Sequence, residues 1–526
     1  MPSFMDFFNY GEDHLTTGLA LRIASGKITG RITPVATEVI EKSRKRVDEI
    51  VANHQSVYGI NTGFGPLCTT IISEKDTKTL QYNILKSHSV GVGDPISPEI
   101  AKLMMILKVH ALSMGYSGIA MSTLERIIWH IDHDIIPIVP SQGSVGASGD
   151  LAPLSHLFLP LIGLGEVYSD GIRTETGKAL QKFGLAPVEL GAKEGLALIN
   201  GTQFIAAHAV KVVERLQNCL DNADLIAAMN LEAMLGSVKT FTEELHLLRP
   251  YRGTIYVAER MRRLLADSEM VQSHKNCTRV QDPYSLRCIP QVHGASRNAF
   301  LHLKELLHIE LNSVTDNPIL LRDGSSVSGG NFHGQPLAMA LDYAAVAAAE
   351  LGNIADRRIY LSLKDTIPGL PKLLMRETGL NSGFMIPQYT TAALVSENKS
   401  LCFPASADSI PTSMGQEDHV SMGSISARKC LMIIDNLEKI LGIELFCAAQ
   451  GFDFRKPLKS GVILEACHDL VREQIPFAES DHVMSEEMNK AIAMVKNKSL
   501  VKCSGEVASG YGIKLKNEED ELFGIY

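Results

Sequence analysis

The sequence lacks an apolar run of membrane-spanning length and lacks an excess of basic residues. Hydrophobic residues make up 45% of its 526 residues, but polar residues interrupt every stretch before it reaches the about 20 apolar positions of a membrane helix. The 50 Lys and Arg residues are outnumbered by 59 Asp and Glu, which leaves a formal net charge of -9. The short basic run Lys42–Arg46 suits a solvated helix face. Because phosphate recognition needs concentrated positive charge, we expect no nucleic acid and no membrane as partners.

Paired cysteines are missing as well. The nine cysteines are scattered from Cys68 to Cys503 without a Cys-x-x-Cys pair, and their number is odd. This pattern favours free thiols in a reducing compartment over a disulfide framework. The first residues, MPSFMDFFNYGED, lack the basic start and long apolar core of a signal peptide. The sequence therefore predicts a cytoplasmic location.

Complete metal and nucleotide motifs are also lacking. His130 and His133 stand three residues apart with acidic residues between them, but no third ligand follows at a suitable spacing. The glycines at positions 59, 63 and 65 do not have the GxGxxG spacing of a dinucleotide-binding turn. We therefore expect neither a metal ion nor a nucleotide as cofactor.

Long spans with helical periodicity make up much of the chain. Apolar residues recur every three or four positions over 213–234, 300–311, 344–355 and 425–445. Long helices of this kind pack best side by side, as a bundle. Strand signals are short and few, such as Ser56–Ile60. The sequence predicts a mainly α fold, with a long-helix bundle core and a smaller N-terminal domain that contains short strands.

Three regions follow from this pattern. The N-terminal domain covers residues 1–200 and carries the glycine-rich loop described next, and the bundle domain covers 201–503. The last segment, 504–526, mixes glycine with an acidic run and is a candidate for a mobile tail.

The loop SQGSVGASGD, at 141–150, is the most unusual segment. Gly149 has no Cβ, which permits its amide nitrogen to approach the Ala147 carbonyl carbon. Cyclisation with loss of two waters would convert Ala147, Ser148 and Gly149 into a 4-methylidene-imidazol-5-one. Its methylene, formerly the Ser148 side chain, is a strong electrophile of the kind that enzymes otherwise take from a bound cofactor. A plainer interpretation is a tight turn with Asp150 near the N-cap of the next helix. Two further Ala-Ser-Gly triplets, at 24–26 and 508–510, lack the glycine-rich approach.

Separate blocks between about Tyr58 and about Phe454 resemble the aromatic amino acid ammonia-lyases, a family that includes phenylalanine and tyrosine lyases and aminomutases. They are YGINTGFG at 58, GSVGASGDLAPLSH at 143, LINGTQ at 198, SHKNC at 273, QDPYSLRC at 281, SGGNFHG at 328, NSGFMI at 381 and QEDHVSM at 416. SHKNC, NSGFMI and QEDHVSM are similar to the histidine-specific members in particular. The resemblance implies a carbon–nitrogen lyase that eliminates ammonia from L-histidine to give trans-urocanate through the imidazolone ring.

The resemblance also implies roles for individual residues. Tyr58 matches the base that takes the β-proton, and its phenol, with an ordinary pKa near 10, has to be acidified by its neighbours. Arg287 matches the group that binds the substrate carboxylate, which a planar guanidinium can pair with through two hydrogen bonds. Tyr284 shares a face with Arg287 if the segment is helical, and it matches a family tyrosine near the ring. Asn200 matches a hydrogen-bond donor to the ring or to the substrate carboxylate. Phe332 matches an aromatic residue packed on the cofactor. Tyr58 and Phe332 would otherwise be ordinary packing aromatics.

Two residues bear on the choice of amino acid. His88 lies where the family contacts the substrate ring, and a histidine there is found in both histidine and tyrosine lyases. Glu417 favours histidine, because a carboxylate binds an imidazole N–H with charge assistance. Opposite a phenyl ring it would be a buried charge without a partner.

Other interpretations remain open at this stage. Within the family, the chain could be a tyrosine or phenylalanine ammonia-lyase or an aminomutase. Outside it, Ser148 could be the nucleophile of a serine hydrolase with His156 as its base, although a GxSxG elbow is lacking. The resemblance finally implies a homotetramer with active sites shared between chains. The apolar circumference of the spans near Ala345 and Ile434 fits such an assembly.

Overall fold

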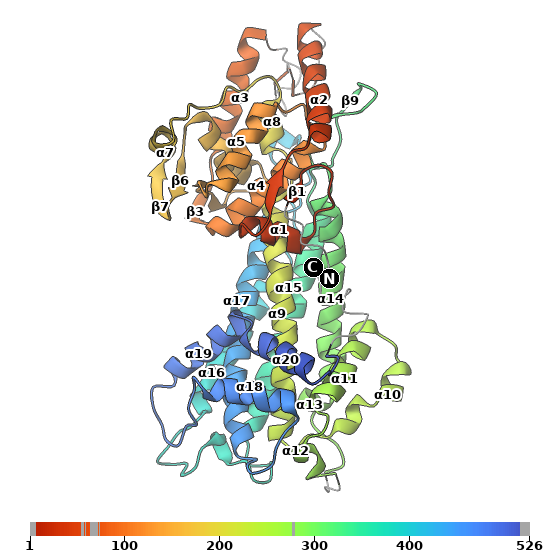
Figure 1. The fold of residues 1–526 in the computed structure, drawn as a ribbon, viewed down its shortest axis with the longest axis vertical. Coiled ribbons are helices and arrows are strands. Elements are labelled where there is room, and N and C mark those ends of the chain that lie inside the picture. The colour runs from red at the N-terminus through yellow and green to blue at the C-terminus, as the bar shows by residue number, and fades with distance from the viewer. Residues whose placement is uncertain are drawn as a thin grey trace. The chain divides into compact units, whose positions relative to one another are not determined.

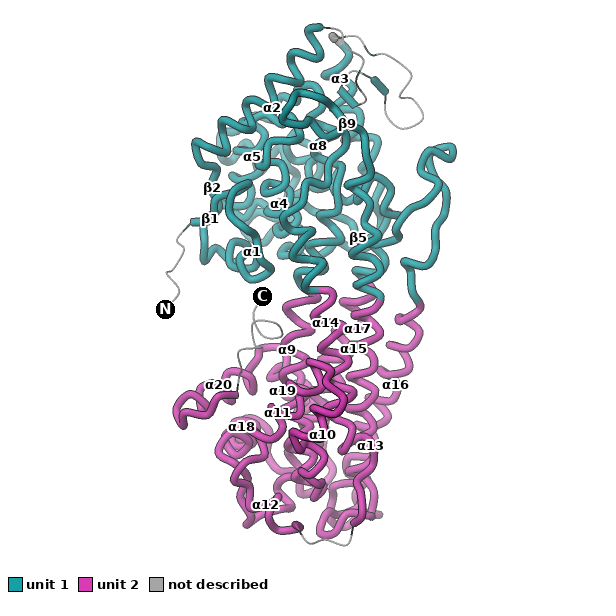
Figure 2. Tube along the Cα trace, turned by 90° about the vertical axis from the view of Figure 1, so that its right-hand side faces the viewer, with its two compact units in different colours: residues 1–211, 304–342, 404–428 teal, residues 212–303, 343–403, 429–526 magenta. Residues whose placement is uncertain are grey.

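The described part of the chain forms two compact units (Figure 2). The computed structural model describes residues 7–53, 57, 59–60, 62–63, 72, 74–275 and 279–515. Unit 1 consists of residues 1–211, 304–342 and 404–428, and unit 2 consists of residues 212–303, 343–403 and 429–526. The sequence-based boundary at residue 200 lies close to the first crossing between the units. The structure also places two later segments, 304–342 and 404–428, in unit 1, whereas the sequence assigned them to the bundle.

Short and medium helices form most of unit 1. They are α1 (Thr17–Ala24), α2 (Pro34–Ala52), α3 (Glu74–His88), α4 (Pro98–Ser113), α5 (Met121–Asp132), α6 (Leu151–Phe158), α7 (Thr176–Lys182) and α8 (Glu194–Ile199), with a 3₁₀ turn over Leu159–Ile162 and another over Ser413–Gly415. Two of them start with the same local chemistry, a hydroxyl N-cap followed by proline. Thr33 caps α2 and Ser97 caps α4, and in each case the side-chain oxygen accepts a backbone N–H of the first turn.

The strands of the described chain all lie in unit 1 and form small sheets. A parallel pair joins β1 (Phe7–Asn9) to β2 (Thr29–Arg31), and antiparallel pairs join β3 (Val92–Pro95) to β5 (Pro140–Gln142) and β8 (Ile319–Leu320) to β9 (Ser326–Val327). In a three-stranded antiparallel sheet, the central strand β6 (Glu166–Ser169) pairs with β4 (Ile136–Pro137) on one side and with β7 (Ile172–Glu175) on the other. Short strands in the N-terminal part were predicted. The strand expected at Ser56–Ile60 lies partly outside the described residues, and Gly59 and Ile60 form a turn.

Helix α4 supplies much of the core of unit 1. All of its residues from Ile100 to Ser113 are buried, and it packs against α1, α2 and α5. Burial on every side means that polar residues of α4 are also removed from water. Lys102 and Lys108 are the two lysines among them, and a buried ammonium group needs a partner. These partners turn out to lie in two different parts of unit 1.

Long helices dominate unit 2 (Figure 1). Four of them, α9 (Gln203–Ala233), α14 (Ile289–Leu311), α15 (Gln335–Ser362) and α17 (Gly423–Asp453), have residues in both units, and their unit 2 portions lie side by side in both views. The shorter helices are α10 (Glu243–Leu247), α11 (Arg252–Leu264), α12 (Glu269–Gln272), α13 (Tyr284–Arg287), α16 (Met385–Leu401), α18 (Val462–Arg472), α19 (Ser485–Lys496) and α20 (Ser499–Gly510), with 3₁₀ turns over Val238–Phe241 and Lys372–Leu374.

The predicted helical spans agree with this architecture. Three of the four spans chosen by periodicity fall inside α14, α15 and α17, and the fourth, 213–234, ends one residue beyond α9, which confirms the mainly α class. The predicted tail, 504–526, begins inside α20, and residues 516–526 lie outside the described part of the chain.

Buried charges in the long helices show a feature that apolar periodicity does not reveal. Asp224 of α9 is fully buried, and it accepts hydrogen bonds from Arg297 Nη2 at 2.6 Å and His293 Nδ1 at 2.8 Å. The same Arg297 nitrogen lies 3.0 Å from Asp221. Buried carboxylates are tolerated when they are paired in this way.

One helix differs from the sequence-based expectation about apolar runs. By length and composition alone, α15 is apolar enough to cross a membrane, and 67% of its most apolar window is buried inside the protein. The expectation that no segment reaches this length is therefore wrong for α15. Its burial is what a core helix shows.

Candidate functional site

The glycine-rich loop of unit 1 is held by Gly201. The Gly201 N–H donates to the Ser148 carbonyl oxygen at 3.2 Å, and the Gly201 carbonyl accepts the Asp150 N–H at 2.8 Å. Residue 201 follows α8 and precedes α9, so the loop is fixed by a segment about 50 residues further along the chain. These two hydrogen bonds fix the backbone on either side of Gly149.

Asp150 ties the same loop to the start of α9. Its Oδ2 accepts the Phe204 and Ile205 N–H groups at 3.1 and 3.0 Å, and Ser144 Oγ donates to its Oδ1 at 3.3 Å. Burial raises the pKa of Asp150 to about 7, against the effect of these hydrogen bonds. The sequence predicted Asp150 at the N-cap of its own helix. It occupies that position before α6, but its side chain makes no capping bond there and caps α9 instead.

The loop needs glycine both for its backbone conformation, as the sequence predicted for Gly149, and for close contacts with distant segments that the sequence did not reveal. Ser148 has φ +49° and Gly149 has φ +82°, so two consecutive residues are left-handed. A Cβ on Gly149 would lie 2.1 Å from the Gly201 carbonyl oxygen, and a Cβ on Gly146 would lie 2.2 Å from Ser421 Oγ. Close approach of other backbone and side-chain atoms, together with positive φ, therefore excludes any side chain at these two positions.

The returning segment 404–428 lines the loop on another side. The Met422 N–H donates to the Val145 carbonyl at 3.0 Å, and Ser424 Oγ donates to the Ser144 carbonyl at 2.7 Å. Ala147 packs in one apolar cluster with Val420 and Met422. Segments some 270 residues apart in sequence thus build a single site.

Glu417 is placed beside Ser148 by these contacts. The Ser148 hydroxyl lies 3.5 Å from Glu417 Oε1. The other carboxylate oxygen, Oε2, accepts hydrogen bonds from the hydroxyls of Thr412, at 3.1 Å, and Ser413. Glu417 Oε2 is therefore fixed by the protein, while Oε1 faces the glycine-rich loop 141–150, the reactive loop. This arrangement suits a carboxylate that holds a donor group of a ligand.

His88, at the end of α3, belongs to the same neighbourhood. Its ring accepts or donates a hydrogen bond with Ser87 Oγ at 3.0 Å. Partial burial lowers the pKa of His88, while a backbone hydrogen bond at Ile84 and the charge of Glu417 act in the opposite direction. The charge of Glu417 thus acts on the His88 ring, and the prediction that both residues contact the substrate ring stays a prediction.

Asn200 is buried at the end of α8. Its Nδ2 donates to the Asn317 carbonyl at 3.0 Å, and its own carbonyl accepts a hydrogen bond from Lys108 Nζ. Asn200 directly precedes Gly201, whose backbone is hydrogen-bonded to the loop, and the predicted bond from Asn200 to the ring or the carboxylate stays a prediction. Its side chain is bonded to the protein.

Phe332 lies half-buried in the loop before α15. The neighbouring His333 hydrogen-bonds through Nε2 to the His419 carbonyl at 3.2 Å, and the two imidazole rings stack with centroids 5.8 Å apart. This brings the Phe332 loop against the Glu417 segment within unit 1.

Arg287 and Tyr284 lie in unit 2, on the single turn α13. The Arg287 guanidinium carbon lies 4.6 Å from the Tyr284 ring centroid, which confirms that the two residues share a face. Tyr284 is 70% exposed, whereas Arg287 Nε is buried without a hydrogen-bond partner. Tyr58, the predicted base, lies outside the described residues.

The serine hydrolase interpretation requires a base at Ser148, and its candidate is engaged elsewhere. His156 Nε2 accepts the Gly91 N–H at 3.0 Å, while Ser148 faces Glu417. The pairing of Ser148 with His156 is therefore wrong for this structure.

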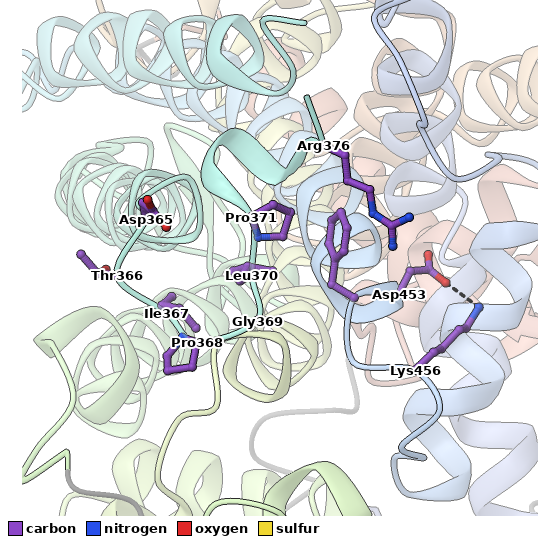
Figure 3. Close-up of a pocket in the computed structure, with 11 residues that line it drawn as sticks. Asp365, Thr366, Ile367, Pro368, Gly369, Leu370, Pro371, Arg376, Asp453 and Lys456 are labelled. Carbon is purple, nitrogen blue, oxygen red and sulfur yellow. Dashed lines mark ion pairs between the residues drawn. The ribbon is translucent and has the colours of Figure 1, made fainter. Parts of the chain in front are cut away.

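A cavity of about 770 Å³ lies in unit 2, lined by residues that the sequence did not single out (Figure 3). Two acidic residues line it, Asp365 and Asp453, and Asp453 already pairs with Lys456 and with Arg472 at 2.6 Å. This pairing leaves the carboxylate neutralised. In the described residues, no cluster of three or more His, Cys, Asp or Glu is arranged for a metal ion.

Sequence reasoning missed the residues that hold the reactive ones. Gly201 lies inside the LINGTQ block that carried the family resemblance, but nothing in the sequence indicates that its backbone binds the loop. Thr412 and Ser413 precede Glu417 by five and four residues and carried no signal, because hydroxyl residues in a loop are common. Lys108 was hidden in an apolar helix.

The chain as a whole is similar to a known protein family and to solved structures. The model of the family described as aromatic amino acid lyase matches residues 15–473. A histidine ammonia-lyase of Natranaerobius thermophilus is 47% identical over 468 residues, which covers 89% of this chain and 92% of that protein. The crystal structure of histidine ammonia-lyase from Trypanosoma cruzi has a TM-score of 0.89 at 40% identity, covering 99% of this chain and 97% of that chain. A tyrosine aminomutase from Streptomyces globisporus has a TM-score of 0.89 at 34% identity, covering 94% and 98%.

Proposed function

This chain belongs to the aromatic amino acid lyase family, and on that premise we propose that it is a histidine ammonia-lyase that converts L-histidine to trans-urocanate and ammonia. The position of Glu417 carries the proposal. Its Oε1 faces Ser148 at 3.5 Å, while Thr412 and Ser413 hold its Oε2. A carboxylate fixed in this way is suited to accept an imidazole N–H with charge assistance.

The residues of the loop fit a protein-derived 4-methylidene-imidazol-5-one. Ser148 and Gly149 are curled into consecutive left-handed conformations, and the space where a Gly149 Cβ would lie is filled by Gly201. Formation of the ring joins Gly149 N to the Ala147 carbonyl carbon and expels two waters, one of them carrying the Ser148 hydroxyl oxygen. When formed, the group supplies an electrophilic carbon toward which the substrate amine donates its electrons.

The chain's own residues then bind the substrate and move its proton. Glu417 orients the imidazole, with His88 beside it, and Arg287 pairs with the carboxylate through its planar guanidinium. Tyr58 takes the β-proton as the general base. Asn200 and Phe332 support the loop, and Tyr284 packs on Arg287. These roles come from the family resemblance, and the short distance between Ser148 and Glu417 supports the part that concerns the imidazole.

We further propose that the working form is a cytoplasmic homotetramer with active sites shared between chains. The resemblance to the family implies the assembly, and the absence of paired cysteine motifs favours the reducing compartment. The assembly is tested at the scale of the whole molecule below.

Product formation tests the activity directly. The purified protein is incubated separately with L-histidine, L-tyrosine and L-phenylalanine, and the ultraviolet absorbance of each conjugated acrylate product is followed. We expect sustained product formation from histidine and at most a trace from the two others. Faster turnover of tyrosine or phenylalanine would contradict the choice of substrate. Accumulation of a β-amino acid, seen by chromatography, would identify an aminomutase instead.

A further inference from the structure

Lys108 has no role in the reaction as described so far, although it lies directly behind the reactive loop. It is 1% exposed in the middle of α4, and its Nζ donates a hydrogen bond to the Asn200 carbonyl oxygen. Burying an ammonium group costs free energy unless a partner repays it. A charge kept at this position therefore calls for an explanation.

The partner that Lys108 binds is one end of a single peptide group. The Asn200 carbonyl and the Gly201 N–H belong to the same amide, and that N–H donates to the Ser148 carbonyl oxygen at 3.2 Å. An ammonium group on the carbonyl end draws electrons away from the nitrogen end. The amide N–H then becomes a stronger donor, because hydrogen bonds in a chain polarise one another.

This series of hydrogen bonds ends at the Ser148 carbonyl oxygen, which has a role in the proposed chemistry. If the ring forms, the Ser148 carbonyl oxygen becomes the ring oxygen, which is conjugated with the methylene carbon. A donor aimed at that oxygen makes the methylene more electron-poor. Fixed donors of this kind are among the most effective devices in enzymes because they are already oriented when charge develops.

We propose that Lys108 is a positioning residue that polarises the Asn200–Gly201 peptide and thereby strengthens the hydrogen bond from Gly201 to the Ser148 carbonyl oxygen. This inference rests on the proposed function, because it assigns a role to Lys108 only if the ring is formed from Ser148. Lys108 would make the ring more electrophilic through this peptide, without touching the substrate.

The charges around Lys108 determine when it carries its proton. Burial lowers the pKa of Lys108 to about 7, and the charges of Asp316 and Asp150 act against this shift while Lys193 acts with it. Lys193 and Asp316 themselves form a buried ion pair at 2.7 Å. Lys108 therefore loses its proton as the pH rises through neutrality, and the polarisation of the Gly201 N–H falls in the same range.

A purely structural role for Lys108 is the alternative, and a matched lysine separates the two. Lys102 is also buried, is also in α4, and is ion-paired with Asp134 away from the reactive loop. Lys102→Met removes a buried lysine from the same helix without changing the Asn200–Gly201 peptide. Lys108→Met removes the charge at nearly constant side-chain volume, and Lys108→Arg keeps a charge that does not titrate near neutrality.

The near-ultraviolet absorbance of the ring is the main measurement, made on the substrate-free, full-length protein from pH 6 to pH 8. The wild type and Lys102→Met should show a band that moves to shorter wavelength as the pH rises, with one apparent ionisation. Lys108→Met should show the short-wavelength band at every pH, and Lys108→Arg should show no shift. In turnover of histidine, Lys108→Met should lower kcat by about tenfold with little change in KM.

Three outcomes would overturn the proposal. They are a wild-type band that does not move with pH, a Lys108→Met band that still moves, and equal effects of Lys108→Met and Lys102→Met on the band and on kcat. If Lys108→Met does not fold, the wild-type titration and Lys108→Arg decide the question alone. A wild type without any near-ultraviolet band would contradict the proposed cofactor instead, so failure of the two ideas is distinguishable.

Discussion

At the scale of single residues, the proposed chemistry of the loop depends on the Ser148 hydroxyl. It is the group that the proposed dehydration would expel, and Ser148 has a left-handed backbone conformation that few non-glycine residues adopt. The sequence offers a natural comparison, because the triplet Ala508–Ser509–Gly510 has the same letters but lies at the end of α20, where nothing surrounds a Cβ on Gly510.

We expect Ser148→Ala to fold and to lose its near-ultraviolet band and nearly all activity. The free energy of unfolding should change by about 1 kcal/mol or less, since the loop is small and the apolar core is untouched. Ser509→Ala should resemble the wild type in absorbance and turnover. Clear residual activity in Ser148→Ala would show that the electrophile has another source.

Glu417, in the same neighbourhood, is the residue that we propose to determine the choice of substrate. Glu417→Gln keeps the size of the side chain and removes its charge, so the imidazole loses a charge-assisted partner. We expect kcat/KM for histidine to fall by about 10- to 100-fold, equivalent to 1.4–2.7 kcal/mol. Any trace activity on tyrosine should change much less. Thr412→Val, which removes one of the hydroxyls on Oε2, should give a smaller loss in the same direction.

Steady-state kinetics on both amino acids provide the measurement for Glu417→Gln. An equal loss for histidine and tyrosine would instead make Glu417 a general structural or acid–base group. The near-ultraviolet band reports independently whether the ring has formed in the variant, so a failure of maturation is not mistaken for a change of specificity.

At the scale of secondary-structure elements, the reactive loop is hydrogen-bonded to the start of α9 through Asp150. Asp150 accepts the N–H groups of Phe204 and Ile205 while its own N–H is bonded to Gly201. The first turn of a helix leaves backbone N–H groups without acceptors within the helix. In α9, the buried Asp150 carboxylate from another segment accepts two of these N–H groups. The position of the loop is therefore coupled to the folding of α9.

Asp150→Ala should uncouple the loop from the helix. Two buried N–H groups lose their acceptor, which should lower the free energy of unfolding by about 1 to 3 kcal/mol. Ring formation should also slow, which is measured as a delayed rise of the near-ultraviolet band after synthesis. Asp150→Asn retains an acceptor oxygen and should be milder in both respects. An unchanged melting temperature together with normal maturation in Asp150→Ala would refute this coupling.

At the scale of the whole molecule, the proposed residues are divided between the two units. Ser148, His88, Asn200 and Glu417 belong to unit 1, whereas Arg287 belongs to unit 2. A tetramer with shared sites would supply residues from more than one chain to each centre. Obligate oligomers of this kind have symmetric interfaces and no active monomer.

Complementation tests the shared site. Inactive Tyr58→Phe and inactive Arg287→Ala are mixed, unfolded, refolded together and assayed for histidine turnover. If the two residues of one site come from different chains, some mixed tetramers contain an intact site and part of the activity returns. Each variant refolded alone is the control. No recovery, with mixed tetramers demonstrated by mass, would place both residues on one chain or exclude the shared site.

The sequence by itself determined the class of elements and the identity of the reactive loop. Helical periodicity located α9, α14, α15 and α17 because the spacing of apolar side chains is a local property of the chain. The blocks around Ser148, Arg287 and Glu417 carried the resemblance to the family, because each is a short run of neighbouring residues that can be read directly from the sequence.

Tertiary structure alone decided which residues hold the site in place. Nothing local to Asp150 indicates that it caps α9 in preference to α6, and nothing local to α4 indicates that Lys108 binds the Asn200 carbonyl. The return of 404–428 to unit 1 likewise depends on packing between distant segments. A buried polar group must find a partner wherever the fold provides one, so its partner is fixed by the arrangement of the whole chain and its neighbours in sequence do not reveal it.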